Sequence, residues 1–87
     1  MTVPNSILAS YVGSYPLAPT LVVNVTRDGG KLYAQASNRP RFRLWAESPS
    51  YFYLRVVPTK VSFERDSTGV PVLVLNQNGA TQRARKQ

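Results

Sequence analysis

Apolar and polar side chains alternate along the middle of the chain with the two-residue period of a β-strand that has one buried face. The apolar positions of the two clearest segments are Phe42, Leu44 and Ala46, followed by Phe52, Leu54 and Val56. The same inward set continues through Leu21, Val23, Val25, Leu32, Ala34, Ala36, Val61, Phe63, Leu73 and Leu75. The pattern therefore predicts several strands whose apolar faces share one core.

Turn signals separate these segments at intervals of about ten residues, which is typical of all-β folds. They are Asp28-Gly29-Gly30, Asn38-Arg39-Pro40, Glu47-Ser48-Pro49-Ser50, Asp66-Ser67-Thr68-Gly69 and Asn78-Gly79. We predict strands over residues 11–15, 21–27, 31–36, 41–46, 51–56, 60–65, 72–77 and 80–85. The helical candidate is a single turn over residues 6–10.

About eight hairpin-linked strands with one apolar face can bury that face by curling into a barrel, which also removes exposed edges. We therefore expect an all-β fold, a small antiparallel β-barrel with a short N-terminal helical turn, formed by residues 1–87 as a single domain. A two-sheet sandwich is the alternative closure. Phe42, Phe52 and Phe63 are bulky enough to predict a packed interior, and a small apolar ligand inside the barrel is a hypothesis to test.

Keeping the apolar side chains on one face also predicts which outward residues stand side by side. One predicted outer row joins Asn24, Tyr33, Trp45, Tyr53 and Glu64, and the row beside it joins Gln35, Arg43, Arg55 and Ser62. Large aromatics that face away from a core are typical of a partner interface. The candidate interaction surface is therefore Tyr33, Trp45, Tyr53, Arg43 and Arg55. The competing interpretation is that these rings only cover their own sheet or pack beneath the N-terminal turn.

The residue inventory argues against catalysis by this chain. It has 87 residues, no histidine and no cysteine, and four acidic side chains against eleven basic ones. These leave no disulfide, no plausible metal site and no expected cofactor. The motifs Ser-x-x-Lys, Lys-Thr-Gly and Gly-x-Ser-x-Gly are absent, so no nucleophile has a recognisable base beside it. We expect a domain that is not itself an enzyme.

The net charge of +7 would attract phosphates, anionic lipids or an acidic partner surface. Single-stranded nucleic acid is one such partner, because Arg39 and Arg41 add to the arginines and aromatics of the candidate surface. Outward arginines more commonly keep a protein soluble, so nucleic acid is the weaker interpretation. No apolar run approaches the roughly 18 residues of a membrane span, and the first residues lack the features of an export signal.

Several stretches of the chain match a known family. They are Tyr11-Val12-Gly13-Ser14-Tyr15, Val25-Thr26-Arg27-Asp28-Gly29-Gly30-Lys31-Leu32-Tyr33-Ala34-Gln35-Ala36, Phe52, Phe63 and Leu73-Val74-Leu75-Asn76-Gln77-Asn78-Gly79. Together they resemble the C-terminal lipocalin-like domain, of unknown function, of bacterial serine β-lactamase-like (penicillin-binding-protein-like) hydrolases. The chain departs from that family at Asn38, where glycine is usual, and at Pro58-Thr59, and both departures concern loop geometry.

The resemblance implies a lipocalin-like barrel that is a non-catalytic accessory domain of a serine hydrolase and contributes docking, assembly, or substrate or ligand binding. Its partner would be the hydrolase's catalytic domain, in the same chain or separate, and the parent would be a periplasmic or otherwise exported bacterial protein. No catalytic residue is carried over, because the parent's serine, lysine and tyrosine motifs belong to the other domain. A free-standing small-ligand carrier, a nucleic-acid-binding barrel and a homo-oligomer stay open as alternatives.

Overall fold

The computed structural model describes residues 3–37, 39–55, 58–77 and 79–87. Within them, a short helix and eight strands follow one another: α1 (Asn5–Tyr11), β1 (Gly13–Ala18), β2 (Leu21–Asp28), β3 (Lys31–Ala36), β4 (Phe42–Ser48), β5 (Tyr51–Tyr53), β6 (Thr59–Arg65), β7 (Pro71–Gln77) and β8 (Ala80–Arg85). Each strand pairs antiparallel with the next, so the sheet is a meander in the order β1 to β8. The prediction of an all-β antiparallel barrel with a short N-terminal helical segment is confirmed.

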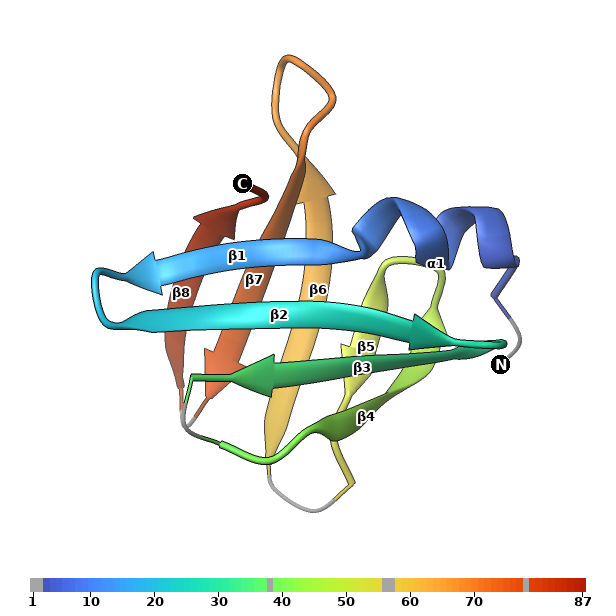
Figure 1. Cartoon of the computed structure of the whole chain (residues 1–87), viewed down its shortest axis with the longest axis horizontal. Coiled ribbons are helices and arrows are strands. Elements are labelled where there is room, and N and C mark those ends of the chain that lie inside the picture. Colours follow the sequence, from blue (N-terminus) through green and yellow to red (C-terminus); the bar gives the residue numbers. More distant parts are fainter. Residues whose placement is uncertain (1–2, 38, 56–57, 78) are drawn as a thin grey trace.

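The barrel forms because the two halves of the sheet cross each other. Figure 1 shows β1 to β4 running across the front of the molecule while β6 to β8 pass behind them at a steep angle. The two edges meet beyond the end of β8, where the backbone N–H of Gln87 donates to the carbonyl oxygen of Ser14 in β1 at 2.9 Å. The barrel is therefore nearly closed, which protects strand edges that would otherwise be free to pair with another chain.

The first element boundary differs from the prediction. Tyr11 was expected to begin a strand, but it is the last residue of α1, and β1 begins at Gly13. The helix gives way to the strand there, and Gly13 adopts a φ of 154°, which residues with a side chain rarely occupy. Of the other predicted features, the loop at Asn38, the inward side chain of Val56 and the hairpin turn at Asn78 lie outside the described residues.

The helix α1 covers one end of the barrel and shares its core. The Tyr11 ring stacks on Phe63, and Phe52 meets both rings edge-on, with centroids 6.1 Å from Tyr11 and 5.8 Å from Phe63. The hydroxyl of fully buried Tyr15 donates to the Tyr11 carbonyl oxygen at 2.7 Å. Bulky aromatic side chains therefore pack against one another beneath the end of α1.

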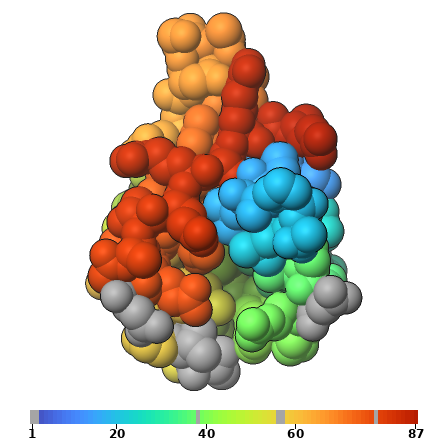
Figure 2. Space-filling view, turned by 90° about the vertical axis from the view of Figure 1, so that its left-hand side faces the viewer, coloured from blue at the N-terminus to red at the C-terminus, as the bar shows by residue number. Residues whose placement is uncertain are grey.

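The opposite end of the barrel contains a cavity of about 260 Å³, so the predicted packed interior is wrong there. The physical reason is side-chain size, because Ala34 and Ala36 on β3 face this space and contribute only methyl groups. Figure 2 looks onto this side of the molecule, where a hollow lies between the blue turn that joins β1 to β2, the red strand β8 and the green segment before β4.

The strand register is the second correction. Tyr33 pairs with Thr26 and Arg43 rather than with Asn24 and Trp45. The two-residue turn between Asp28 and Lys31 fixes the first of these pairs, because every later pair in the hairpin is counted from it. Further along, Trp45 does stand opposite Tyr53 as predicted.

The remaining members of the two predicted outer rows are displaced in the same way. Tyr53 stands opposite Lys60 instead of Glu64, and Gln35 pairs with Asn24. Ser62 pairs with Tyr51. Each displacement is an even number of residues, so every one of these side chains stays on its predicted side of the sheet.

Candidate interaction surface

The structure brings the five predicted surface residues to the outer side of β3, β4 and β5. Tyr33 and Arg43 are cross-strand partners on β3 and β4, and Trp45 and Tyr53 are partners on β4 and β5. Arg55 lies two residues beyond the end of β5 and is exposed, whereas the other four side chains are half-buried. We call these five residues the basic–aromatic surface.

Trp45 lies between two arginines at the centre of the basic–aromatic surface. The guanidinium carbon of Arg43 is 3.7 Å from the centroid of the Trp45 ring, and that of Arg55 is 3.5 Å away. Both guanidinium groups are therefore in direct contact with the indole ring. Each contact contributes about 0.5–1 kcal/mol at an exposed site, and together they hold three long side chains in one arrangement.

Two further cation–aromatic pairs flank this centre. The guanidinium carbon of Arg41 lies 4.1 Å from the centroid of the Tyr33 ring. On the other side, the Lys60 ammonium lies 5.7 Å from the centroid of Tyr51. Tyr51 and Lys60 are not among the five residues predicted from the sequence, although Tyr51 shares the outward parity of Tyr53 and Arg55. The missing information was the β5–β6 register, which sets Lys60 opposite Tyr53.

A cavity of about 200 Å³ lies beside Trp45. Its lining includes Arg43, Trp45, Tyr53 and Arg55 together with apolar residues of the barrel's helix-covered end. The Nε atom of Arg43 is buried there and has no hydrogen-bond partner among the described residues. A buried donor without an acceptor costs free energy.

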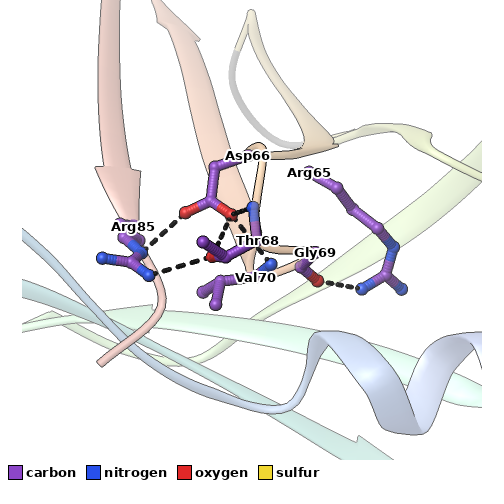
Figure 3. A network of polar contacts seen from close by, with 6 residues as sticks. All are labelled: Arg65, Asp66, Thr68, Gly69, Val70 and Arg85. Carbon is purple, nitrogen blue, oxygen red and sulfur yellow. Dashed lines mark hydrogen bonds and ion pairs between the residues drawn. The ribbon is translucent and has the colours of Figure 1, made fainter.

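The acidic side chains that form ion pairs in the described part of the chain lie away from this surface. Glu64 pairs with Arg83 at 3.7 Å and Asp66 with Arg85 at 2.7 Å. Figure 3 shows the second pair in the turn after β6, where Asp66 also accepts hydrogen bonds from the Thr68 hydroxyl and from backbone N–H groups. These hydrogen bonds lower the pKa of the Asp66 carboxyl, and the one from the Thr68 hydroxyl contributes most.

Burial changes the titration of two phenols in the core. The pKa values of Tyr11 and Tyr15 are both raised, chiefly by burial, so these phenols stay protonated at neutral pH and serve as hydrogen-bond donors. Across residues 3–37, 39–55, 58–77 and 79–87, no group of three or more acidic, histidine or cysteine side chains could hold a metal ion. In the same residues no helix is long and apolar enough to cross a membrane.

The meander barrel and its cation–aromatic outer face define a small antiparallel β-barrel domain. The chain belongs to the family described as Domain of unknown function (DUF3471), whose model matches residues 1–83. It is also 27% identical over 82 residues to Penicillin-binding protein 4* of Bacillus subtilis (strain 168). That alignment covers 94% of this chain and 18% of the relative, so the chain spans less than a fifth of the relative's length. No solved structure matches the chain.

The two matches confirm the resemblance to a domain of penicillin-binding-protein-like proteins. They cover nearly the whole chain and therefore include every residue of the basic–aromatic surface. An accessory domain of a β-lactamase-like protein fits both the matches and the small share of the relative that the alignment covers.

Proposed function

We propose that this chain is a non-catalytic accessory domain of a penicillin-binding-protein-like serine hydrolase, and that the basic–aromatic surface docks it onto an acidic face of the catalytic domain. The observation that carries the proposal is the packing of both Arg43 and Arg55 against the Trp45 ring. Trp and Arg are the residue types that dominate binding energy at protein interfaces. Here they are already ordered, which lowers the entropic cost of docking.

The charge and hydrogen-bonding character of the surface indicates what the partner presents. Arg41, Arg43, Arg55 and Lys60 put positive charge on this face, while the two ion pairs found in the described residues lie elsewhere. The guanidinium of Arg55 is exposed. A carboxylate from the partner could accept hydrogen bonds from it and neutralise part of the charge.

The similarity to a penicillin-binding protein also supports a proposal for cellular location. A penicillin-binding-protein-like parent would be an exported bacterial protein, and this domain would then work outside the cytoplasm. The absence of cysteine is compatible with that setting, because packing rather than disulfides holds the barrel together.

The first experiment measures the mass of the natural polypeptide with an antibody raised against this domain. We expect a band several times heavier than the 9.7 kDa of the chain itself. A band at the mass of the chain alone, with no co-purifying hydrolase, would overturn the proposal of an accessory domain.

The second experiment tests the surface in that full polypeptide by calorimetric unfolding and limited proteolysis. Replacing Arg43 and Arg55 with Gln removes two charges and both stacking contacts. We expect the barrel to unfold separately from the rest of the protein and proteases to cut between them earlier. A matched variant, Arg27→Gln with Arg83→Gln, removes two exposed charges from β2 and β8 and should leave the single transition intact. Equal behaviour of the two double variants would contradict the assigned surface.

Nucleic acid is the rival partner, and the geometry favours it less. A base binds such a surface by stacking on an aromatic face, but two guanidinium groups already lie over the Trp45 ring. Tyr33 likewise has Arg41 over its ring. Titration of labelled single-stranded DNA at rising salt concentration decides the question. Micromolar binding that weakens steeply with salt would replace the docking proposal with the nucleic-acid interpretation.

A further inference from the structure

The barrel carries a second feature that the docking proposal does not use, the cavity at the end opposite α1. Its volume is about 260 Å³, and its walls include side chains from both crossing halves of the sheet. Leu17, Phe42, Leu54 and Leu75 are among them, and all four are only half-buried although they face inward. An apolar interior that stays partly accessible to solvent is the usual character of a small-ligand site.

Polar side chains also border this cavity. Arg39 precedes β4, Gln77 ends β7 and Gln82 lies on β8, and all three are exposed. The Arg39 guanidinium can offer a carboxylate two parallel hydrogen bonds, and the glutamine amides can add a donor each. The site therefore combines an apolar interior with one cationic group at its border. Such a site complements a ligand that has an apolar chain and an anionic head.

We infer that this cavity binds a small apolar molecule with an anionic head, such as a medium-chain carboxylate, with the chain inside the barrel and the carboxylate at Arg39. The volume sets the size of the ligand. A cavity of about 150 Å³ accommodates benzene, so a space of 260 Å³ suits roughly ten non-hydrogen atoms. Octanoate has that size and that chemistry. The inference does not depend on the docking proposal, because the two sites share no residue.

Calorimetric titration and thermal unfolding of the 87-residue chain test the inference with a series of straight-chain carboxylates from butyrate to dodecanoate. We expect octanoate to bind with a dissociation constant between about 10 µM and 1 mM, as suits a ligand of this size. Affinity should rise by about fourfold for each methylene added until the cavity is full, and then level off. No heat and no stabilisation with any member of the series would overturn the inference.

Two variants separate the roles of the cavity and of its charge. Ala36→Leu fills the space and should weaken octanoate binding at least tenfold, whereas Ala9→Leu adds the same side chain to the exposed face of α1 and should have no effect. Arg39→Gln should weaken octanoate binding but leave the neutral analogue octanol within about twofold, and Arg27→Gln should change neither. Equal octanoate affinity in Ala36→Leu and Ala9→Leu would contradict binding inside the cavity. Unchanged octanoate affinity in Arg39→Gln would contradict a contact between the carboxylate and Arg39.

Amide chemical-shift mapping of the unmodified chain keeps the inference testable if Ala36→Leu does not fold. Octanoate should shift the amides of Ala34, Ala36, Leu54 and Leu75, which surround the cavity. Shifts confined to β4 and β5 around Trp45 would place the ligand on the basic–aromatic surface instead and would contradict the inference.

Discussion

The ring of Tyr11 in α1 lies almost parallel to the ring of Phe63 in β6, with centroids 4.1 Å apart and 9° between the planes. This stack joins residues 52 positions apart in the sequence and fixes the helix over the end of the barrel. The Tyr11 hydroxyl adds a second tie, because it donates to the carbonyl oxygen of Pro49 in the turn after β4 at 2.9 Å. One side chain therefore connects α1, β6 and the β4–β5 hairpin.

Truncating Tyr11 should destabilise the barrel more than any surface change. Removing a large buried aromatic costs about 3–5 kcal/mol, so Tyr11→Ala should lower the free energy of unfolding by that amount. Tyr11→Phe keeps the stack and removes only the hydrogen bond to Pro49, so it should cost about 0.5–1.5 kcal/mol. Urea unfolding followed by circular dichroism measures both. Similar losses in the two variants would show that the ring stack contributes little.

Acid should weaken the fold through Asp66. Its carboxyl pKa is lowered in the folded chain, first by the hydrogen bond from the Thr68 hydroxyl and to a smaller extent by backbone N–H groups and Arg85. A lowered folded-state pKa contributes stability that is complete above the unfolded value of about 3.9 and is lost as the pH falls through the folded value. We expect unfolding free energy to decrease below about pH 4, and Asp66→Asn to reduce that decrease.

Nuclear magnetic resonance titration of the Asp66 carboxyl carbon tests the order of these causes. Thr68→Val should raise the Asp66 pKa further than Arg85→Gln does, because the hydroxyl is the largest of the lowering contributions and the arginine the smallest. The opposite order would assign the lowered pKa to the ion pair with Arg85.

Much of this fold could be predicted from the residues alone, because inward and outward positions depend only on a two-residue period. Leu44 and Phe52 are buried as that period requires, and β3 and β8 have the predicted bounds. Register depends on turn geometry instead. The turn between β2 and β3 sets Tyr33 opposite Thr26, whereas the predicted partner was Asn24. The end of α1 was missed because Tyr11 fits a strand pattern as well as it fits a helix end.

The basic–aromatic surface could likewise be predicted from the sequence only in part. Its five residues could be chosen because large outward aromatics with neighbouring arginines stand out in an alternating pattern. The stacking of Arg55 on Trp45 could not be predicted from the sequence. Arg55 lies beyond the end of β5, and the direction of its side chain is set by tertiary packing. The cavity near Ala34 and Ala36 was also missed, because the space left by two alanines depends on what the opposite half of the barrel contributes.

Alkali should destabilise the barrel through Tyr15. Burial, and next the neighbouring Tyr11, raise the pKa of its phenol in the folded chain. A raised folded-state pKa contributes stability that is complete below the unfolded value of about 10 and is lost as the pH rises toward the folded value. Unfolding free energy should therefore fall above about pH 10, and less steeply in Tyr15→Phe. A parallel pH dependence in the two proteins would show that Tyr15 ionises as easily in the fold as in the unfolded chain.

Gly13 should resist substitution for two separable reasons. Its φ of 154° is rarely adopted by other residues, and a Cβ there would lie 2.6 Å from the Cε of Lys86. We expect Gly13→Ala to lower the free energy of unfolding by about 1–3 kcal/mol. Combining it with Lys86→Ala removes the close contact but not the backbone strain, so stability should recover in part. Full recovery would mean that the backbone conformation carries no cost, and the comparison with Lys86→Ala alone corrects for the lost lysine.

The charged setting of Trp45 should govern how ionic quenchers reach it. The chain has a single tryptophan, so its fluorescence reports on this site alone. Two guanidinium groups within 4 Å of the ring centroid attract anions and repel cations at low salt, so iodide should quench more efficiently than caesium. Replacing Arg43 and Arg55 with Gln should bring the two quenching constants close together, while Arg27→Gln with Arg83→Gln should preserve most of the difference. If wild-type fluorescence resists both ions and neutral acrylamide, Trp45 is covered by its own domain, and the surface could not dock a partner through that ring.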